Sequence, residues 1–166
     1  MKILYFQKVS LIDMPGHVAS VVYCQGCNRN CEYCHNPESI PQDVPGKLRW
    51  QQVIDYLITR IRQIDAVIFS GGEPTLQEDL IPCMKQCQDM GFKIGMHTNG
   101  DGPYYEAAAP LCDYILLSHY NNKKIEIAEQ AKEVQLSKVV RDKLTGEWEN
   151  KISSISKNSQ NEKINT

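Results

Sequence analysis

Four cysteines fall in the short stretch CQGCNRNCEYCHNPE at residues 24–38. Three residues separate Cys27 from Cys31, and two residues separate Cys31 from Cys34. Three thiolates at such short spacing favour a soft metal centre. Zinc modules usually separate two ligand pairs by about a dozen residues or more, so the spacing favours an iron–sulfur cluster over a zinc site.

A cluster held by only three cysteines would leave one iron open to a reactant. An ordinary [4Fe–4S] cluster takes four cysteine ligands. We therefore expect this stretch to be the active centre. Cys24 forms a Cys-x-x-Cys pair with Cys27 and is either a fourth ligand or, as we favour, a buried strand residue. A non-enzymatic zinc module that uses Cys24, Cys27, Cys31 and Cys34 is the alternative from a different class of protein.

Length and composition describe an ordinary soluble globular protein. The 166 residues are 42% apolar and 23% charged, which predicts one domain over residues 1–149. The polar residues 150–166 are expected to form a disordered tail. The net charge of −2, without a basic block, argues against nucleic-acid binding. The sequence has no apolar stretch of membrane-spanning length and no signal peptide, so we expect a cytoplasmic protein without a membrane partner.

Short apolar runs alternate with segments of helical spacing along the chain. Strands are predicted at residues 2–8, 17–24, 65–70, 92–97 and 112–120, with a further strand at 138–141. Helices are predicted from Trp50 to Ile61, from a capping box at Thr75 and Glu78 to Met90, at 103–109 and at 121–135. This alternation indicates an α/β fold of parallel strands joined by right-handed crossovers.

Three polar or glycine-rich loops follow the ends of predicted strands. They are the cysteine loop, the Gly71-Gly72-Glu73-Pro74 loop and the Thr98-Asn99-Gly100 loop. In parallel α/β folds the reactive groups gather at the carboxyl ends of the strands. We therefore expect the three loops to meet on one face.

These motifs resemble those of a known family. The Cys27-x-x-x-Cys31-x-x-Cys34 motif with Tyr33, followed by Gly-Gly-Glu-Pro on the next strand's loop, resembles the radical S-adenosylmethionine (radical SAM) enzymes. Residues 5–120 further resemble the glycyl radical enzyme activating enzymes, and most closely the activating proteins for anaerobic ribonucleoside-triphosphate reductase. The resemblance implies a partial (β/α) barrel, with parallel strands and outer helices, that is open on one side.

The resemblance also implies a reaction. Cys27, Cys31 and Cys34 would bind three irons of a [4Fe–4S] cluster, and S-adenosyl-L-methionine would bind the fourth. One electron from a donor such as flavodoxin or ferredoxin would cleave the cosubstrate, and the resulting radical would generate a glycyl radical on the partner enzyme. A radical SAM enzyme acting on a small molecule, similar to 7-carboxy-7-deazaguanine synthase, is the alternative. An open cleft would favour the activating enzyme, and a complete pocket of convergent polar groups would favour the small molecule.

Cosubstrate ligands follow from the same resemblance, and no catalytic residue is expected beyond the cluster and cosubstrate. Tyr33 would stack near the adenine, Glu73 and exposed backbone carbonyls would accept hydrogen bonds from the ammonium group, and Thr98 or Asn99 would bind ribose or carboxylate. Loop packing and plain turns are the alternatives for these positions. The full set of expected cosubstrate-binding residues is Tyr33, Gly71, Gly72, Glu73, Pro74, Thr98 and Asn99. Longer relatives carry Asp-x-Lys where this chain has Ser118 and Tyr120, which is the main departure from the family pattern.

Overall fold

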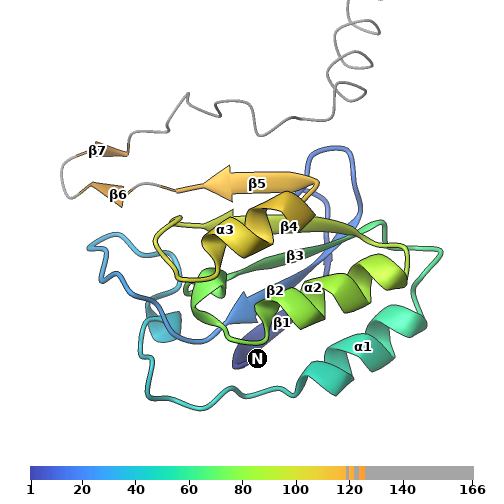
Figure 1. The fold of residues 1–166 in the computed structure, drawn as a ribbon, viewed down its shortest axis with the longest axis horizontal. Coiled ribbons are helices and arrows are strands. Elements are labelled where there is room, and N and C mark those ends of the chain that lie inside the picture. The colour runs from blue at the N-terminus through green and yellow to red at the C-terminus, as the bar shows by residue number, and fades with distance from the viewer. Residues whose placement is uncertain (119, 122–123, 126–166) are drawn as a thin grey trace, which may run out of the picture. The chain divides into compact units, whose positions relative to one another are not determined.

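The computed structural model describes residues 1–118, 120–121 and 124–125 (Figure 1). Five strands form one sheet in sequential order, and every neighbouring pair except the first is parallel. A separate antiparallel pair of two-residue strands follows. The five strands are β1 (Ile3–Ser10), β2 (Ala19–Cys24), β3 (Ala66–Gly71), β4 (Lys93–Thr98) and β5 (Tyr114–Leu117), and the separate pair is β6 (Tyr120–Asn121) and β7 (Lys124–Ile125).

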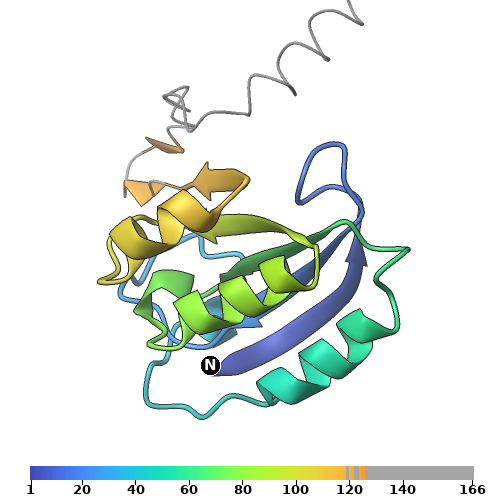
Figure 2. The ribbon, with the colours of Figure 1, turned by 45° about the vertical axis from the view of Figure 1, so that its right-hand side comes forward.

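Helices connect the parallel strands and cover one face of the sheet (Figure 2). α1 (Trp50–Ile58) lies between β2 and β3, α2 (Leu80–Asp89) between β3 and β4, and α3 (Tyr105–Ala108) between β4 and β5. Short 3₁₀ turns occupy Pro37–Ser39, Pro74–Leu76 and Ala109–Leu111. Buried side chains of α1 and α2 pack with those of the central strands in the main core. The opposite face carries a smaller cluster that includes Met14, Val21 and Ile68.

The fold class agrees with the prediction: the sheet is mainly parallel, carries outer helices and does not close. The first strand pair departs from the expected repeat. β1 is antiparallel to β2, because the loop between them holds no helix that could return the chain to the starting edge. β1 is therefore an edge strand, and it belongs to a hairpin rather than to a crossover unit.

The predicted capping box at Thr75 and Glu78 is wrong. The side chain of Glu73 accepts a hydrogen bond from the backbone N–H of Thr75 and caps the 3₁₀ turn Pro74–Leu76. α2 starts later, at Leu80, so Pro82 stands in its first turn, where a missing N–H costs no helical hydrogen bond. Gly91 follows the helix with φ +90°, so the helix stops beside its predicted end at Met90.

Only some of the predictions for the chain after residue 118 fall on residues that the structure describes. A helix was expected at 121–135, but residues 120–121 and 124–125 form the two short strands. The rest of that segment, the strand expected at 138–141 and the tail expected at 150–166 lie outside the described residues. Within the described residues, no helix has both the length and the apolar character required to cross a membrane.

Candidate active site

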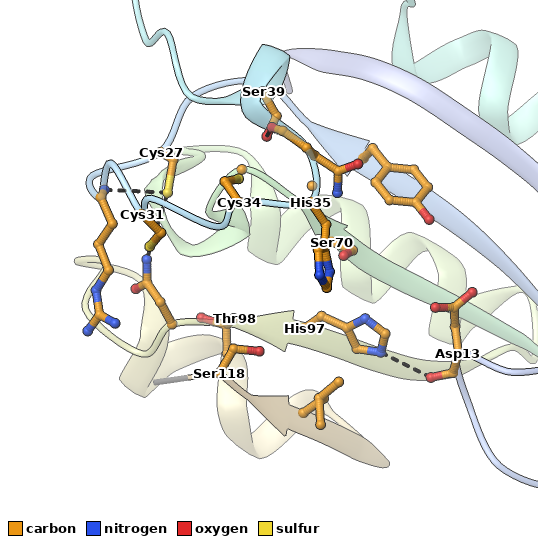
Figure 3. Close-up of a pocket in the computed structure, with 17 residues that line it drawn as sticks. Asp13, Cys27, Cys31, Cys34, His35, Ser39, Ser70, His97, Thr98 and Ser118 are labelled. Carbon is orange, nitrogen blue, oxygen red and sulfur yellow. Dashed lines mark hydrogen bonds between the residues drawn. The ribbon is translucent and has the colours of Figure 1, made fainter. Parts of the chain in front are cut away.

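The carboxyl ends of β2, β3 and β4 border a pocket of about 410 Å³ (Figure 3). The cysteine loop, the Gly-Gly loop and the Thr-Asn loop all contribute to its lining, so the convergence expected from the strand order is present. Predicted site residues in the lining are Cys27, Cys31, Cys34, Gly71, Gly72, Thr98 and Asn99.

Backbone hydrogen bonds close the base of the cysteine loop. The N–H of Gly26 donates to the carbonyl of Ser39 over 2.8 Å, and the N–H of Cys27 donates to the carbonyl of Ile40 over 3.0 Å. Beneath them the buried Gln25 side chain donates to the carbonyls of Glu38 and Pro41. The loop is thus held at its base while its central residues project toward the pocket.

Only three of the four clustered thiols are accessible from the pocket. Cys27, Cys31 and Cys34 are partly exposed, whereas Cys24 is fully buried at the end of β2. Burial also raises the pKa of the Cys24 thiol far above its ordinary value, which disfavours the thiolate that a metal needs. The structure thus separates Cys24 from the other three.

The accessible thiols suit a cluster better than a single ion. In a cluster each thiolate binds a different iron, so the sulfurs need not converge on one point. Among the described residues, no three His, Cys, Asp or Glu side chains lie close enough together to hold one metal ion. Three partly exposed thiols on one loop fit a [4Fe–4S] cluster.

The two glycines bring the next loop against the base of the cysteine loop. Gly71 has φ +103°, and a Cβ there would lie 2.4 Å from the backbone nitrogen of Cys24. A Cβ on Gly72 would lie 2.2 Å from the carbonyl oxygen of Gly26. The N–H groups of Gly72 and Glu73 donate to the carbonyls of Cys24 and Gly26. Both positions therefore need glycine for this backbone contact, independently of any ligand.

Glu73 points into the protein and is fully buried. Its Oε1 accepts hydrogen bonds from the N–H of Thr75 over 3.0 Å, from the Thr75 hydroxyl over 2.5 Å and from the Thr98 hydroxyl over 2.6 Å. Its Oε2 accepts from the N–H of Asn99 over 2.7 Å. Pro74 is also buried, and Tyr33 is 69% exposed. None of these three residues lines the pocket, so their expected contacts with a cosubstrate remain predictions.

Asn99 connects the β4 loop to the cysteine loop. Its Nδ2 donates to Asn28 Oδ1 over 2.9 Å and lies 3.9 Å from Cys27 Sγ, which also accepts the N–H of Arg29 over 3.4 Å. The Arg29 guanidinium forms an ion pair with Asp101. Partial burial raises the pKa of the Cys27 thiol, and the Arg29 N–H acts in the opposite direction. The sulfur of Cys27 thus has two N–H donors beside it, from Arg29 and Asn99.

The pocket extends away from the cysteines to a polar end that sequence reasoning missed. His97 Nε2 lies 3.0 Å from the carbonyl oxygen of Asp13, and burial lowers the pKa of this imidazole. Figure 3 shows His35 between this end and the cysteine loop. Strand alternation gave one available signal, because it places Tyr23 and His97 on the face of the sheet opposite to that of the core residues Val22 and Met96. Lining residues not singled out from the sequence are Asp13, Tyr23, Arg29, Asn36, Ser39, Ser70, His97 and Leu116.

Ser118 also lines the pocket at the end of β5. Its N–H donates to the carbonyl of Thr98 over 2.9 Å, which continues the parallel pairing of β4 and β5. The side chain of Tyr120 lies outside the described part of the chain.

Residues 21–123 match the family model of the Radical SAM superfamily. The chain belongs to the radical SAM superfamily. Enzymes of this superfamily use a [4Fe–4S] cluster and S-adenosyl-L-methionine, and the three accessible thiols at a strand-end pocket fit those cofactors.

Similar proteins include activating enzymes. The chain is 34% identical over 117 residues to the pyruvate formate-lyase-activating enzyme of Clostridium pasteurianum, covering 67% of this chain and 49% of that protein. It is 35% identical over 99 residues to a Methanocaldococcus jannaschii protein that carries the name of a glycyl-radical enzyme activating enzyme, covering 57% and 39%. It is 37% identical over 82 residues to an S-adenosylmethionine-dependent nucleotide dehydratase of Selenomonas ruminantium, covering 46% and 27%. The chain thus spans no more than about half the length of these relatives.

Among solved structures, the crystal structure of QueE from Escherichia coli matches with a TM-score of 0.46 and 16% sequence identity. The match covers 61% of this chain and 53% of that one. This partial likeness is too weak to bear on function.

Proposed function

We propose that this radical SAM chain activates a glycyl radical enzyme, and that its partner is anaerobic ribonucleoside-triphosphate reductase. The observation that carries the proposal is the set of three partly exposed thiols, separated from a buried fourth, at the end of an open parallel sheet. The similarity to activating enzymes supports the reaction class. The signature SLIDMPGHVASVVYCQGCNRNCEYCHNPE supports the choice of partner.

Cys27, Cys31 and Cys34 would hold the [4Fe–4S] cluster in this proposal. When bound and reduced by one electron from the donor, the cluster would supply the cleavage of S-adenosyl-L-methionine to methionine and a 5′-deoxyadenosyl radical, and this radical would take a hydrogen atom from a glycine of the partner. The chain's own contribution is to place the reactants and exclude water. Gly71, Gly72, Thr98 and Asn99 line the pocket together with the three thiols, where the cosubstrate would bind.

The open sheet favours a protein substrate. β1 and β5 are both edge strands of the described sheet, so the side of the pocket next to β5 is not closed by a further strand of the described residues. A glycine-bearing segment needs such lateral access. The electron donor would be a small one-electron carrier such as flavodoxin or ferredoxin, and the setting would be the anaerobic cytoplasm.

The polar end of the pocket favours the second candidate, a radical SAM enzyme for a small molecule. Asp13, Tyr23, Ser70 and His97 offer convergent hydrogen-bonding groups there. The 37% identity to a nucleotide dehydratase is consistent with this alternative.

The test is formation of a protein radical. The chain, loaded with iron and sulfide and supplied with S-adenosyl-L-methionine and reduced flavodoxin, is mixed anaerobically with anaerobic ribonucleoside-triphosphate reductase. We expect the electron paramagnetic resonance spectrum of a glycyl radical, and none from Cys34→Ser or from a reductase whose radical glycine is alanine. The same assay is run with pyruvate formate-lyase in place of the reductase, and a radical on pyruvate formate-lyase alone would change the partner. Production of deoxyadenosine without a radical on either protein would contradict the activating function.

A further inference from the structure

Glu73 is a fully buried carboxylate that meets four hydrogen-bond donors from two different loops. Burying a charged group is costly unless hydrogen bonds compensate for the lost water. Here Thr75, in the same loop, and Thr98 and Asn99, at the end of β4, provide those bonds. The carboxylate therefore joins the loop after β3 to the loop after β4.

The hydrogen bonds continue from Glu73 to a cluster cysteine through one residue. Glu73 Oε2 holds the backbone N–H of Asn99, and Asn99 Oδ1 accepts the N–H of Asp101 over 2.9 Å. With its backbone and its amide oxygen both held, Asn99 directs Nδ2 toward Asn28 Oδ1 and Cys27 Sγ. The orientation of the donor beside Cys27 thus depends on the buried carboxylate.

We propose that Glu73 is a positioning residue of the cluster site, which acts through Asn99 on the sulfur of Cys27, and not a ligand of the cosubstrate. The inference rests on the proposed cluster site. Its geometric basis is that Glu73 does not line the pocket, whereas Asn99 and Cys27 both do.

Two properties of the cluster should depend on this connection. Hydrogen bonds to cysteine sulfur help to set the reduction potential of an iron–sulfur cluster. An N–H donor stabilises the additional negative charge of the reduced cluster and so raises the midpoint potential. Partners that orient a metal ligand also affect retention, and their loss typically weakens metal binding 10- to 100-fold, an order-of-magnitude range. Loss of the Asn99 donor should therefore lower the midpoint potential and speed iron release, before any cosubstrate is added.

The test variant is Glu73→Gln, which keeps the shape of the side chain. Its amide oxygen still accepts from the two threonines, but its NH₂ group would face the N–H of Asn99, and two donors cannot bond. Asn99→Ala is the second variant, because it removes the donor and keeps the carboxylate. Glu78→Gln is the matched control, since Glu78 is an exposed residue of the same segment and does not line the pocket.

The measurements are made on the reconstituted full chain without S-adenosyl-L-methionine. A redox titration gives the midpoint potential, and a chelator gives the rate of iron release. We expect Glu73→Gln and Asn99→Ala to shift the potential to more negative values and to release iron about 10-fold faster. The double variant should match Asn99→Ala alone, because both changes remove the same interaction. Glu78→Gln should match the unmodified chain.

Three results would overturn the inference. Unchanged potential and iron release in Glu73→Gln, together with weaker cosubstrate binding, would make Glu73 a cosubstrate ligand. If Glu73→Gln does not fold, the Asn99→Ala variant alone decides: a midpoint potential and an iron-release rate equal to those of the unmodified chain would exclude the connection. Additive effects in the double variant would show that the two residues act independently. An unmodified chain that assembles no cluster would instead refute the proposed function, so the two failures are distinguishable.

Discussion

Replacing Gly72 by alanine tests how closely the Gly-Gly loop contacts the base of the cysteine loop. The new Cβ would lie 2.2 Å from the carbonyl oxygen of Gly26 and 2.8 Å from that of Ser39. Both are backbone atoms and cannot rotate away. Since ordinary van der Waals contact begins at 3.4 Å, the loops would have to separate by 3.4 − 2.2 = 1.2 Å along the closer direction.

That separation would also break the 2.8 Å hydrogen bond from the N–H of Glu73 to Gly26. Forcing an extra methyl group into a packed site costs about 1–3 kcal/mol, and losing a buried hydrogen bond costs about 1 kcal/mol. We therefore expect Gly72→Ala to lower the free energy of unfolding by about 2–4 kcal/mol. Urea unfolding of the metal-free chain, followed by circular dichroism, measures this quantity.

Gly16→Ala is the control for this experiment. Gly16 has φ +80°, but a Cβ there would meet nothing within 4 Å, so the substitution introduces conformational strain without a clash. The strain costs about 1 kcal/mol. If Gly72→Ala destabilises the chain no more than Gly16→Ala does, the close contact between the two loops is absent and the reasoning is refuted.

Three further predictions concern the thiols and the polar end of the pocket. Cys24→Ala should leave the iron content of the reconstituted chain unchanged, because Cys24 is fully buried apart from the pocket; loss of iron would make it a ligand. Alkylation of the metal-free folded chain near pH 8, followed by mass spectrometry, should modify the pocket cysteines and spare Cys83 and Cys87. Burial raises the pKa values of these two thiols to about 11 and about 12, so they are protonated at that pH. Rapid labelling of either thiol would contradict their burial. Burial lowers the pKa of His97 below its ordinary 6.5, so the unfolded chain takes up the proton at a higher pH than the folded chain. The free energy of unfolding should therefore fall as the pH drops from 6.5 toward the pKa of His97 in the folded chain. His97→Gln should make that fall smaller in denaturant titrations between about pH 8 and about pH 5, and an identical pH profile would show that His97 is not the group responsible.

The strands and the site's location were predictable because they depend on local patterns. β2 and β3 are short apolar runs that end at the cysteine and Gly-Gly loops, and parallel order brings such ends together. The antiparallel β1 could have been inferred from the absence of a helix between it and β2. The general rule for alternating strands and helices does not apply to a direct hairpin.

The role of Glu73 in the fold depends on contacts between segments distant in the sequence. Thr75 and Glu78 have the spacing of a capping box, but Glu73 takes the Thr75 N–H and hydroxyl first. Its remaining partners lie 25 and 26 residues away, at Thr98 and Asn99. Only the packed structure brings these groups together, so the sequence alone could not indicate this buried hydrogen-bonding centre.

The contribution of Asp13 to the polar end of the pocket could not be identified for a similar reason. Asp13 reaches the pocket from the loop before β2, and its carbonyl oxygen lies 3.0 Å from His97, 84 residues later in the chain. A turn residue and a strand histidine carry no joint signal in a single sequence.

Cosubstrate cleavage is the reaction that tests the central claim most directly. The chain is reconstituted anaerobically with iron and sulfide, reduced and given S-adenosyl-L-methionine, and 5′-deoxyadenosine is quantified beside a Cys31→Ala control. We predict deoxyadenosine from the unmodified chain and none from the variant, whose loop would lack one of its three accessible thiols. A chain that binds one zinc ion, assembles no iron–sulfur cluster and forms no deoxyadenosine would contradict the account.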